Sequence, residues 1–126
     1  MHESVTQATV ALALAEAGVG GEGDAGRVVL WSEIGVYRFL AAAGLRPAEL
    51  HPGAPRLTAQ PELAATVETY LDLAGDAAAT AARLSIHRTT LYYRLSRAAD
   101  LTGADLRDGL QRLSLHLALK AAHLGE

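Results

Sequence analysis

The sequence contains no cysteine among its 126 residues, which excludes disulfide bonds, thiolate nucleophiles and cysteine-ligated metal sites. Aromatic residues make up only 5% of the chain, so a core must be built from small aliphatic side chains that let helices approach closely. No apolar run reaches the roughly 20 residues needed to span a bilayer, and the first residues lack the cationic start of a secretion signal. These absences predict a cytoplasmic protein with no membrane partner.

Alanine and leucine dominate the apolar half of the sequence, with 26 and 21 residues respectively. Both residues favour helices, whereas strands are enriched in β-branched and aromatic residues. The composition therefore predicts a mainly α fold, and the length allows one ordinary domain or two very small ones.

The N-terminal segment, residues 1–45, is predicted to form a helix, a strand and a second helix. Apolar spacing favours helices over 5–17 and 33–43, the second capped by Ser32, and a short β-type run favours a strand over 27–31. One strand cannot satisfy its own backbone hydrogen-bonding groups. We therefore expect residues 1–45 to mediate homodimerisation through paired strands; the alternative is that upstream strands have been lost from this chain.

Proline and glycine punctuate the next segment, which we interpret as a linker over residues 46–60 with one helical turn at most. The remainder, residues 61–126, shows helical periodicity with short breaks, and Pro61 and Asp76 are suited to begin two of its helices. The predicted helices cover 61–74, 77–84, 88–101 and 110–124.

The middle two of these helices, separated by the three-residue break 85–87, match the helix-turn-helix plan. Four apolar side chains are expected to form the buried cluster that fixes the crossing angle of the two helices. They are Leu84, Ile86, Leu91 and Leu95. The alternative is an ordinary helical hairpin with a solvated basic face.

The distribution of charge supports the helix-turn-helix interpretation, although the net charge of the chain is −3. Residues 61–82 carry four acids and no arginine or lysine, whereas residues 83–97 carry four arginines and no acid. The second helix of the motif therefore presents a local basic surface suited to double-stranded DNA.

The helix over about 88–101 is accordingly predicted to be the recognition helix in the major groove. Arg88, Thr89 and Tyr92 face away from the buried cluster and are the candidates for base-edge contacts. Five further residues, including the more lateral Tyr93, are candidates for contacting or positioning phosphates. They are His87, Thr90, Tyr93, Arg94 and Arg97.

Residues 84–95, 101–106 and 112–120 closely resemble the C-terminal helix-turn-helix domain of PucR-type transcriptional regulators. The resemblance implies sequence-specific DNA binding and transcription regulation. More weakly, residues 28–31 and 33–40 resemble the closing strand and helix of the degenerate GGDEF-like domain that commonly precedes this domain in the family. That resemblance implies a remnant of the GGDEF-like domain here.

Nothing in the sequence supports catalysis, a cofactor or a metal. Gly18, Gly20 and Gly23 match the dinucleotide-binding pattern, but a helix precedes them and a strand follows, the reverse of the required order. The face formed by His116, Lys120 and His123 is interpreted as a solvated polar surface, because a metal site wants three or four convergent ligands. We therefore expect no enzyme activity.

A second function remains possible from the sequence: a protein-interaction module that dimerises with a full-length regulator without binding DNA itself. The net acidity favours this alternative. So does the last predicted helix, whose leucines offer more apolar surface than one small core needs. These leucines are Leu110, Leu113, Leu117 and Leu124 on one side and Leu115 and Leu119 on another.

Overall fold

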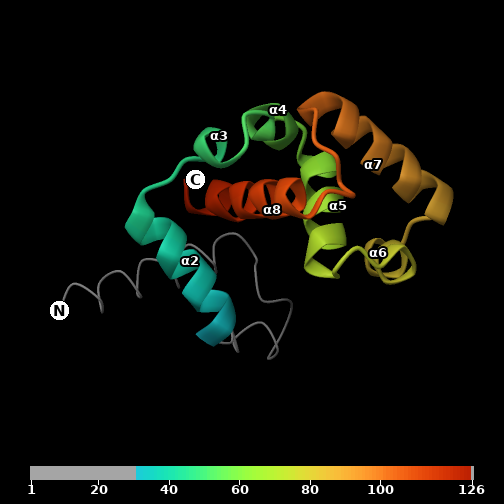
Figure 1. Cartoon of the computed structure of the whole chain (residues 1–126). Coiled ribbons are helices and arrows are strands. Elements are labelled where there is room, and N and C mark those ends of the chain that lie inside the picture. Colours follow the sequence, from blue (N-terminus) through green and yellow to red (C-terminus); the bar gives the residue numbers. More distant parts are fainter. Residues whose placement is uncertain (1–30, 126) are drawn as a thin grey trace. The chain divides into compact units, whose positions relative to one another are not determined.

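A computed structural model describes residues 31–125, in which every regular element is a helix (Figure 1). The helices are α2 (Trp31–Ala43), α3 (Pro47–Leu50), α4 (Ala54–Thr58), α5 (Pro61–Asp72), α6 (Ala77–Leu84), α7 (Arg88–Thr102) and α8 (Gly109–Leu124). The predicted mainly α fold is confirmed. The chain divides into two compact units: one is Pro47–Leu119, and the other includes α2 and the end of α8 from Lys120.

The helix-strand-helix prediction for residues 1–45 is not supported. The predicted helix over 5–17 and residues 27–30 of the predicted strand lie outside the described residues. The last residue of that strand, Trp31, is the first residue of α2, and Ser32 lies inside this helix rather than capping it. The physical reason is that Trp31, Ile34 and Tyr37 follow one another at a helical spacing of three residues, which extends the helix backwards. The expected GGDEF-like remnant loses its strand in the same way.

Helix α5 begins and buries its apolar stripe as predicted. Pro61 occupies its first turn, where the missing N–H costs nothing, and Leu63, Val67 and Leu71 are buried on one face. The helix ends at Asp72, two residues before the predicted end, because the chain enters left-handed backbone geometry just beyond it. Gly75, with φ of +78°, is one of the residues in that conformation.

The helix-turn-helix motif is present at the predicted positions. Asp76 caps α6, and its side chain accepts a hydrogen bond from the backbone N–H of Ala79 at 3.0 Å. Ser85 terminates α6 in the left-handed conformation, and α7 begins three residues later. Thus the three-residue break at 85–87 turns the chain between the two helices of the motif.

The core of the Pro47–Leu119 unit lies where α4, α5, α6, α7 and α8 meet. Helices α5, α6 and α7 pack against one another in pairs, and α4 packs against both α5 and α7 (Figure 1). Of the four predicted cluster residues, Leu91 and Leu95 are buried, whereas Leu84 and Ile86 are half-buried. Leu115 in α8 is fully buried in the same core. Small side chains such as Ala81, at the predicted crossing of α6 and α7, keep the helices close.

Residues 46–60, predicted to be a linker, contain helices α3 and α4 and contribute to the core. Ala54 and Leu57 are fully buried, and α4 lies against α5 and α7. Pro47 and Pro55 stand in the first turns of α3 and α4, where proline is compatible with helix, so these prolines begin helices instead of preventing them. The compact unit therefore begins at Pro47.

Helix α2 has one buried and one exposed apolar side. Tyr37 and Leu40 are buried, whereas Phe39 is 62% exposed and Val36 is 40% exposed. Across residues 31–125, none of the helices combines the length and the apolar character that crossing a membrane requires.

Candidate nucleic-acid interface

Helix α7 presents one buried and one exposed face, as expected for a recognition helix. Leu91, Leu95 and Ala98 are buried in the core, whereas Tyr92 is 52% exposed and Tyr93 is 65% exposed. The prediction that Tyr93 is the more lateral tyrosine is wrong, because it is more exposed than Tyr92. The outward face of α7 is therefore centred nearer to Tyr93 than the sequence indicated.

The N-terminal end of α7 is ordered by a histidine cap. The Nδ1 atom of His87 accepts a hydrogen bond from the backbone N–H of Thr89 at 3.1 Å, so this nitrogen carries no proton. Arg88 and Thr89 are exposed at the same end. Because the positive end of the helix dipole lies here, an anionic group is stabilised at this position.

Arg94 lies differently from the other predicted phosphate-contacting residues. Its guanidinium forms an ion pair with Glu62 of α5, with 3.2 Å between Nη2 and Oε1, and its Nη1 donates to the hydroxyl of Thr66 at 3.4 Å. The side chain of Arg94 is only 21% exposed. The arginine thus ties α7 to α5, a role that the local sequence could not indicate because its partners precede it by about thirty residues.

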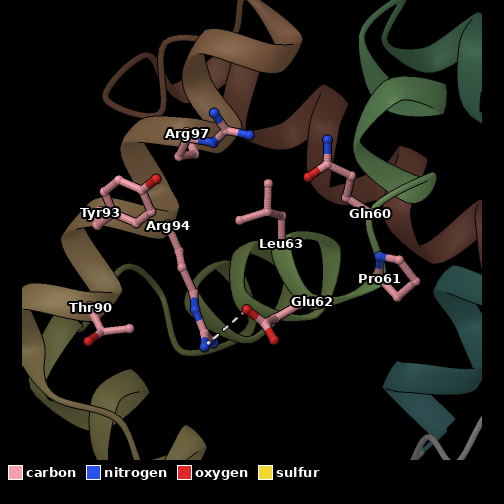
Figure 2. Close-up of a pocket in the computed structure, with 8 residues that line it drawn as sticks. All are labelled: Gln60, Pro61, Glu62, Leu63, Thr90, Tyr93, Arg94 and Arg97. Carbon is pink, nitrogen blue, oxygen red and sulfur yellow. Dashed lines mark ion pairs between the residues drawn. The ribbon is translucent and has the colours of Figure 1, made fainter.

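A shallow groove of about 540 Å³ runs between α7 and the beginning of α5 (Figure 2). Thr90, Tyr93 and Arg97 line one side, and Gln60 and Pro61 line the other. Figure 2 shows the Arg94–Glu62 ion pair at one end of this groove and the guanidinium of Arg97 directed away from that pair. Sequence reasoning missed the α5 side of this groove, because only the packing of α5 on α7 brings the two together.

The outward face of α7 also carries an acid that the sequence analysis did not consider. Asp100 is exposed and follows Arg97 by three residues and Tyr93 by seven, so the three share one side of the helix. Helical spacing alone could have revealed it. The basic character of α7 therefore ends at Arg97, and the last turn of the outward face is acidic.

Outside α7, the polar face of α8 is not simply solvated as predicted. The Nε2 atom of His116 lies 2.6 Å from an Oδ1 oxygen of Asp72 at the end of α5. Arg112 lies over the ring of Tyr70, 5.9 Å from its centroid. These two contacts hold α8 against α5. Within residues 31–125 there is no group of three histidine, aspartate or glutamate side chains that could hold a metal ion.

Comparison with known proteins agrees with this geometry. Residues 63–121 match the family model of the PucR C-terminal helix-turn-helix domain. Uncharacterized proteins of Mycobacterium bovis and Mycobacterium tuberculosis are 34% identical to this chain over 110 residues, which is 86% of this chain and 26% of each of those proteins. The Purine catabolism regulatory protein of Bacillus subtilis is 37% identical over 59 residues, which is 47% of this chain and 11% of that protein.

The chain thus spans about a quarter or less of the length of these relatives. No solved structure matches it. The matched segment includes α6, α7 and most of α5 and α8, which are the helices that form the motif and its core. Fold and sequence match together identify residues 63–121 as a helix-turn-helix domain of the PucR C-terminal type.

Proposed function

We propose that this protein is a sequence-specific DNA-binding transcription regulator that places α7 in the major groove. The observation that carries the proposal is the division of α7 into a buried face, with Leu91 and Ala98, and an exposed face with Tyr93 and Arg97. Helix-turn-helix proteins insert such a helix so that its N-terminal residues reach base edges. The match to the PucR helix-turn-helix domain supports the same reading.

Within this proposal, the exposed residues at the start of α7 read bases. Arg88, Thr89 and Tyr92 supply a guanidinium, a hydroxyl and a phenol, groups that contact base edges or thymine methyl groups. Arg97, Thr90 and Tyr93 lie along the groove beside α5 and contact phosphates. Arg94 positions α7 through Glu62, and His87 orders its first turn.

Titration of labelled duplex DNA over a series of salt concentrations tests this function. The duplexes are a pool of random sequence and the sequences that the wild-type protein selects from that pool. Because binding releases counterions from phosphates, log K should fall linearly with log salt. Absence of any salt-dependent binding would refute the proposal.

Two matched arginine variants sharpen the test. Arg97→Ala should weaken binding to all sequences and reduce the salt slope by about one unit. Arg107→Ala is the control, since this side chain is 94% exposed in the loop before α8 and lies off α7. An equal loss in both variants would indicate only a general effect of net charge.

Arg88→Ala tests base reading. A bidentate contact to guanine contributes about 1–3 kcal/mol of discrimination, so the variant should lose preference at one base pair in each half-site. An unchanged preference in the folded variant would remove Arg88 from the base-reading set.

We further propose that the regulator is a homodimer, because helix-turn-helix dimers bind two half-sites about one helical turn apart. Residues 1–45 remain our candidate for the contact between the two chains. Sedimentation of the full chain at micromolar concentration tests this, and a folded monomer would refute it. Removal of residues 1–45 should abolish the dimer.

The exposed leucines of α8 favour a second candidate function, the protein-interaction module. Leu110 is 71% exposed and Leu113 is 54% exposed, one helical turn apart. In this alternative the chain associates with a full-length regulator and does not bind DNA. The salt titration separates the two functions, because only the first gives a salt-dependent affinity for duplex DNA.

A further inference from the structure

The C-terminal end of α7 is held by residues 47–60, the segment that contains α3 and α4 and that we name the brace. Gly53 lies so close to α7 that a Cβ atom on it would come within 2.4 Å of the carbonyl oxygen of Thr102 and 2.6 Å of its Cα. Glycine is required here for this close approach of two backbones, since the φ of Gly53 is an ordinary −84°.

The brace also supplies a hydrogen bond that α7 cannot make for itself. The last carbonyl groups of a helix have no partner within the helix, and the Nε of Arg56 donates to the carbonyl oxygen of Leu101 at 2.8 Å. The last turn of α7 contains no basic residue and instead contains the exposed Asp100, which is unfavourable at the negative end of the helix dipole. Arg56 therefore provides from α4 the cation that this helix end lacks.

The brace is itself firmly anchored. Ala54 and Leu57 are fully buried in the core, and the turn before α4 is closed by the N–H of Gly53, which donates to Nδ1 of the buried His51 at 3.0 Å. The C-terminal end of α7 is thus clamped to a rigid element. Its N-terminal end is set by the turn from α6, and its middle is tied to α5 by Arg94.

We infer that Arg56 and Gly53 are positioning residues for DNA reading, which act by setting the end of α7 and not by touching DNA. The inference rests on the proposed function. Base readout requires side chains to be held within a fraction of an ångström, so a looser helix end should lower discrimination between sequences before it lowers general affinity. The brace would then determine how α7 sits in the groove.

The test compares Arg56→Ala and Arg56→Lys with Arg107→Ala in the full-length chain. Hydrogen exchange of the Gly103 amide, which donates to the carbonyl of Ala99 at the end of α7, reports on the clamp without DNA. Arg56→Ala should accelerate this exchange by about 3- to 10-fold, as expected for loss of one hydrogen bond from a charged donor. Arg56→Lys should recover much of the protection, and Arg107→Ala should leave it unchanged.

The DNA arm uses duplexes selected by the wild-type protein and the unselected random pool. Arg56→Ala should lower the ratio of selected to random affinity about 3- to 10-fold while leaving the salt slope unchanged, because no phosphate contact is removed. A lowered salt slope with an unchanged ratio would overturn the inference and make Arg56 a phosphate contact. Faster exchange with an unchanged ratio and slope would overturn the positioning role as well.

Gly53→Ala provides an independent second perturbation, because alanine is compatible with the backbone at this position and only the contact with Thr102 is disturbed. It should raise exchange at the end of α7 as Arg56→Ala does, and unchanged exchange in both variants would overturn the clamp. If the wild-type chain shows no salt-dependent binding to DNA, the proposed function fails, and the exchange measurements still decide whether the brace holds α7.

Discussion

Replacing Arg94 with alanine should destabilise the fold and leave the salt dependence of DNA binding unchanged. The guanidinium of Arg94 is engaged with Glu62 at 3.2 Å and with Thr66 at 3.4 Å, and its side chain is 21% exposed. A phosphate could bind this guanidinium only by breaking its contacts with α5. The loss should therefore appear in the free energy of unfolding.

The size of that loss follows from the exposure of the two partners. The side chain of Glu62 is 75% exposed, so solvent screens the ion pair and its coupling free energy should not exceed about 1 kcal/mol. The hydrocarbon part of Arg94 is largely covered, and its removal adds a packing loss of similar size. We expect Arg94→Ala to lower the free energy of unfolding by about 1–2 kcal/mol and Glu62→Gln by less than about 1 kcal/mol.

Urea unfolding of the wild type, the two single variants and the double variant gives the coupling energy directly. The salt titration is then repeated with Arg94→Ala, and Arg97→Ala serves as the matched loss of one charge from α7. A salt slope that falls by about one unit in Arg94→Ala without loss of stability would refute the reasoning. It would show that Arg94 reaches a phosphate and that the ion pair with Glu62 does not hold α7.

Three further predictions concern the ends of α7 and the brace. His87→Ala should lower the free energy of unfolding by about 0.5–2 kcal/mol in urea denaturation, whereas His87→Asn should recover most of it; equal losses would mean that the bond from Thr89 is not a cap. Burial, and secondarily the charge of Arg56, lower the pKa of His51 below its usual 6.5, so the folded state holds this histidine neutral. Stability should therefore be full above pH 6.5 and fall as the pH drops through the lowered pKa; His51→Asn should reduce this slope, and an unchanged slope would contradict the assignment. Asp100→Asn should strengthen binding to random duplex DNA by up to about 1 kcal/mol at low salt, and an unchanged affinity would place the end of α7 away from phosphates.

The helix-turn-helix motif could be predicted from the sequence because its signals are local. Asp76 is a good cap wherever it precedes a helix, and Leu91 and Leu95 lie one turn apart in any α-helix. The boundaries of α6 agree with the prediction, and those of α7 differ from it by one residue. Interactions within a few residues of one another determine all of these features.

Local signals misled the prediction where tertiary contacts outweigh them. The prolines of residues 46–60 resemble those of a linker, but Leu57 is fully buried between helices that are distant in sequence. The predicted strand failed at Trp31, which is helical. Short apolar runs fit either a strand or a helix, and their surroundings decide between them.

The sequence by itself therefore determined the class of the fold, the helices of the motif and the exposed basic face of α7, because helical periodicity and charge distribution are properties of the chain alone. Only the tertiary structure decided what each arginine does. Arg94 and Arg97 are three residues apart on one helix, yet α5 places a carboxylate against the first and leaves the second exposed. Arg56 reaches the end of α7 from 45 residues away. Such pairings depend on which surfaces the buried leucines bring together, and no local pattern encodes them.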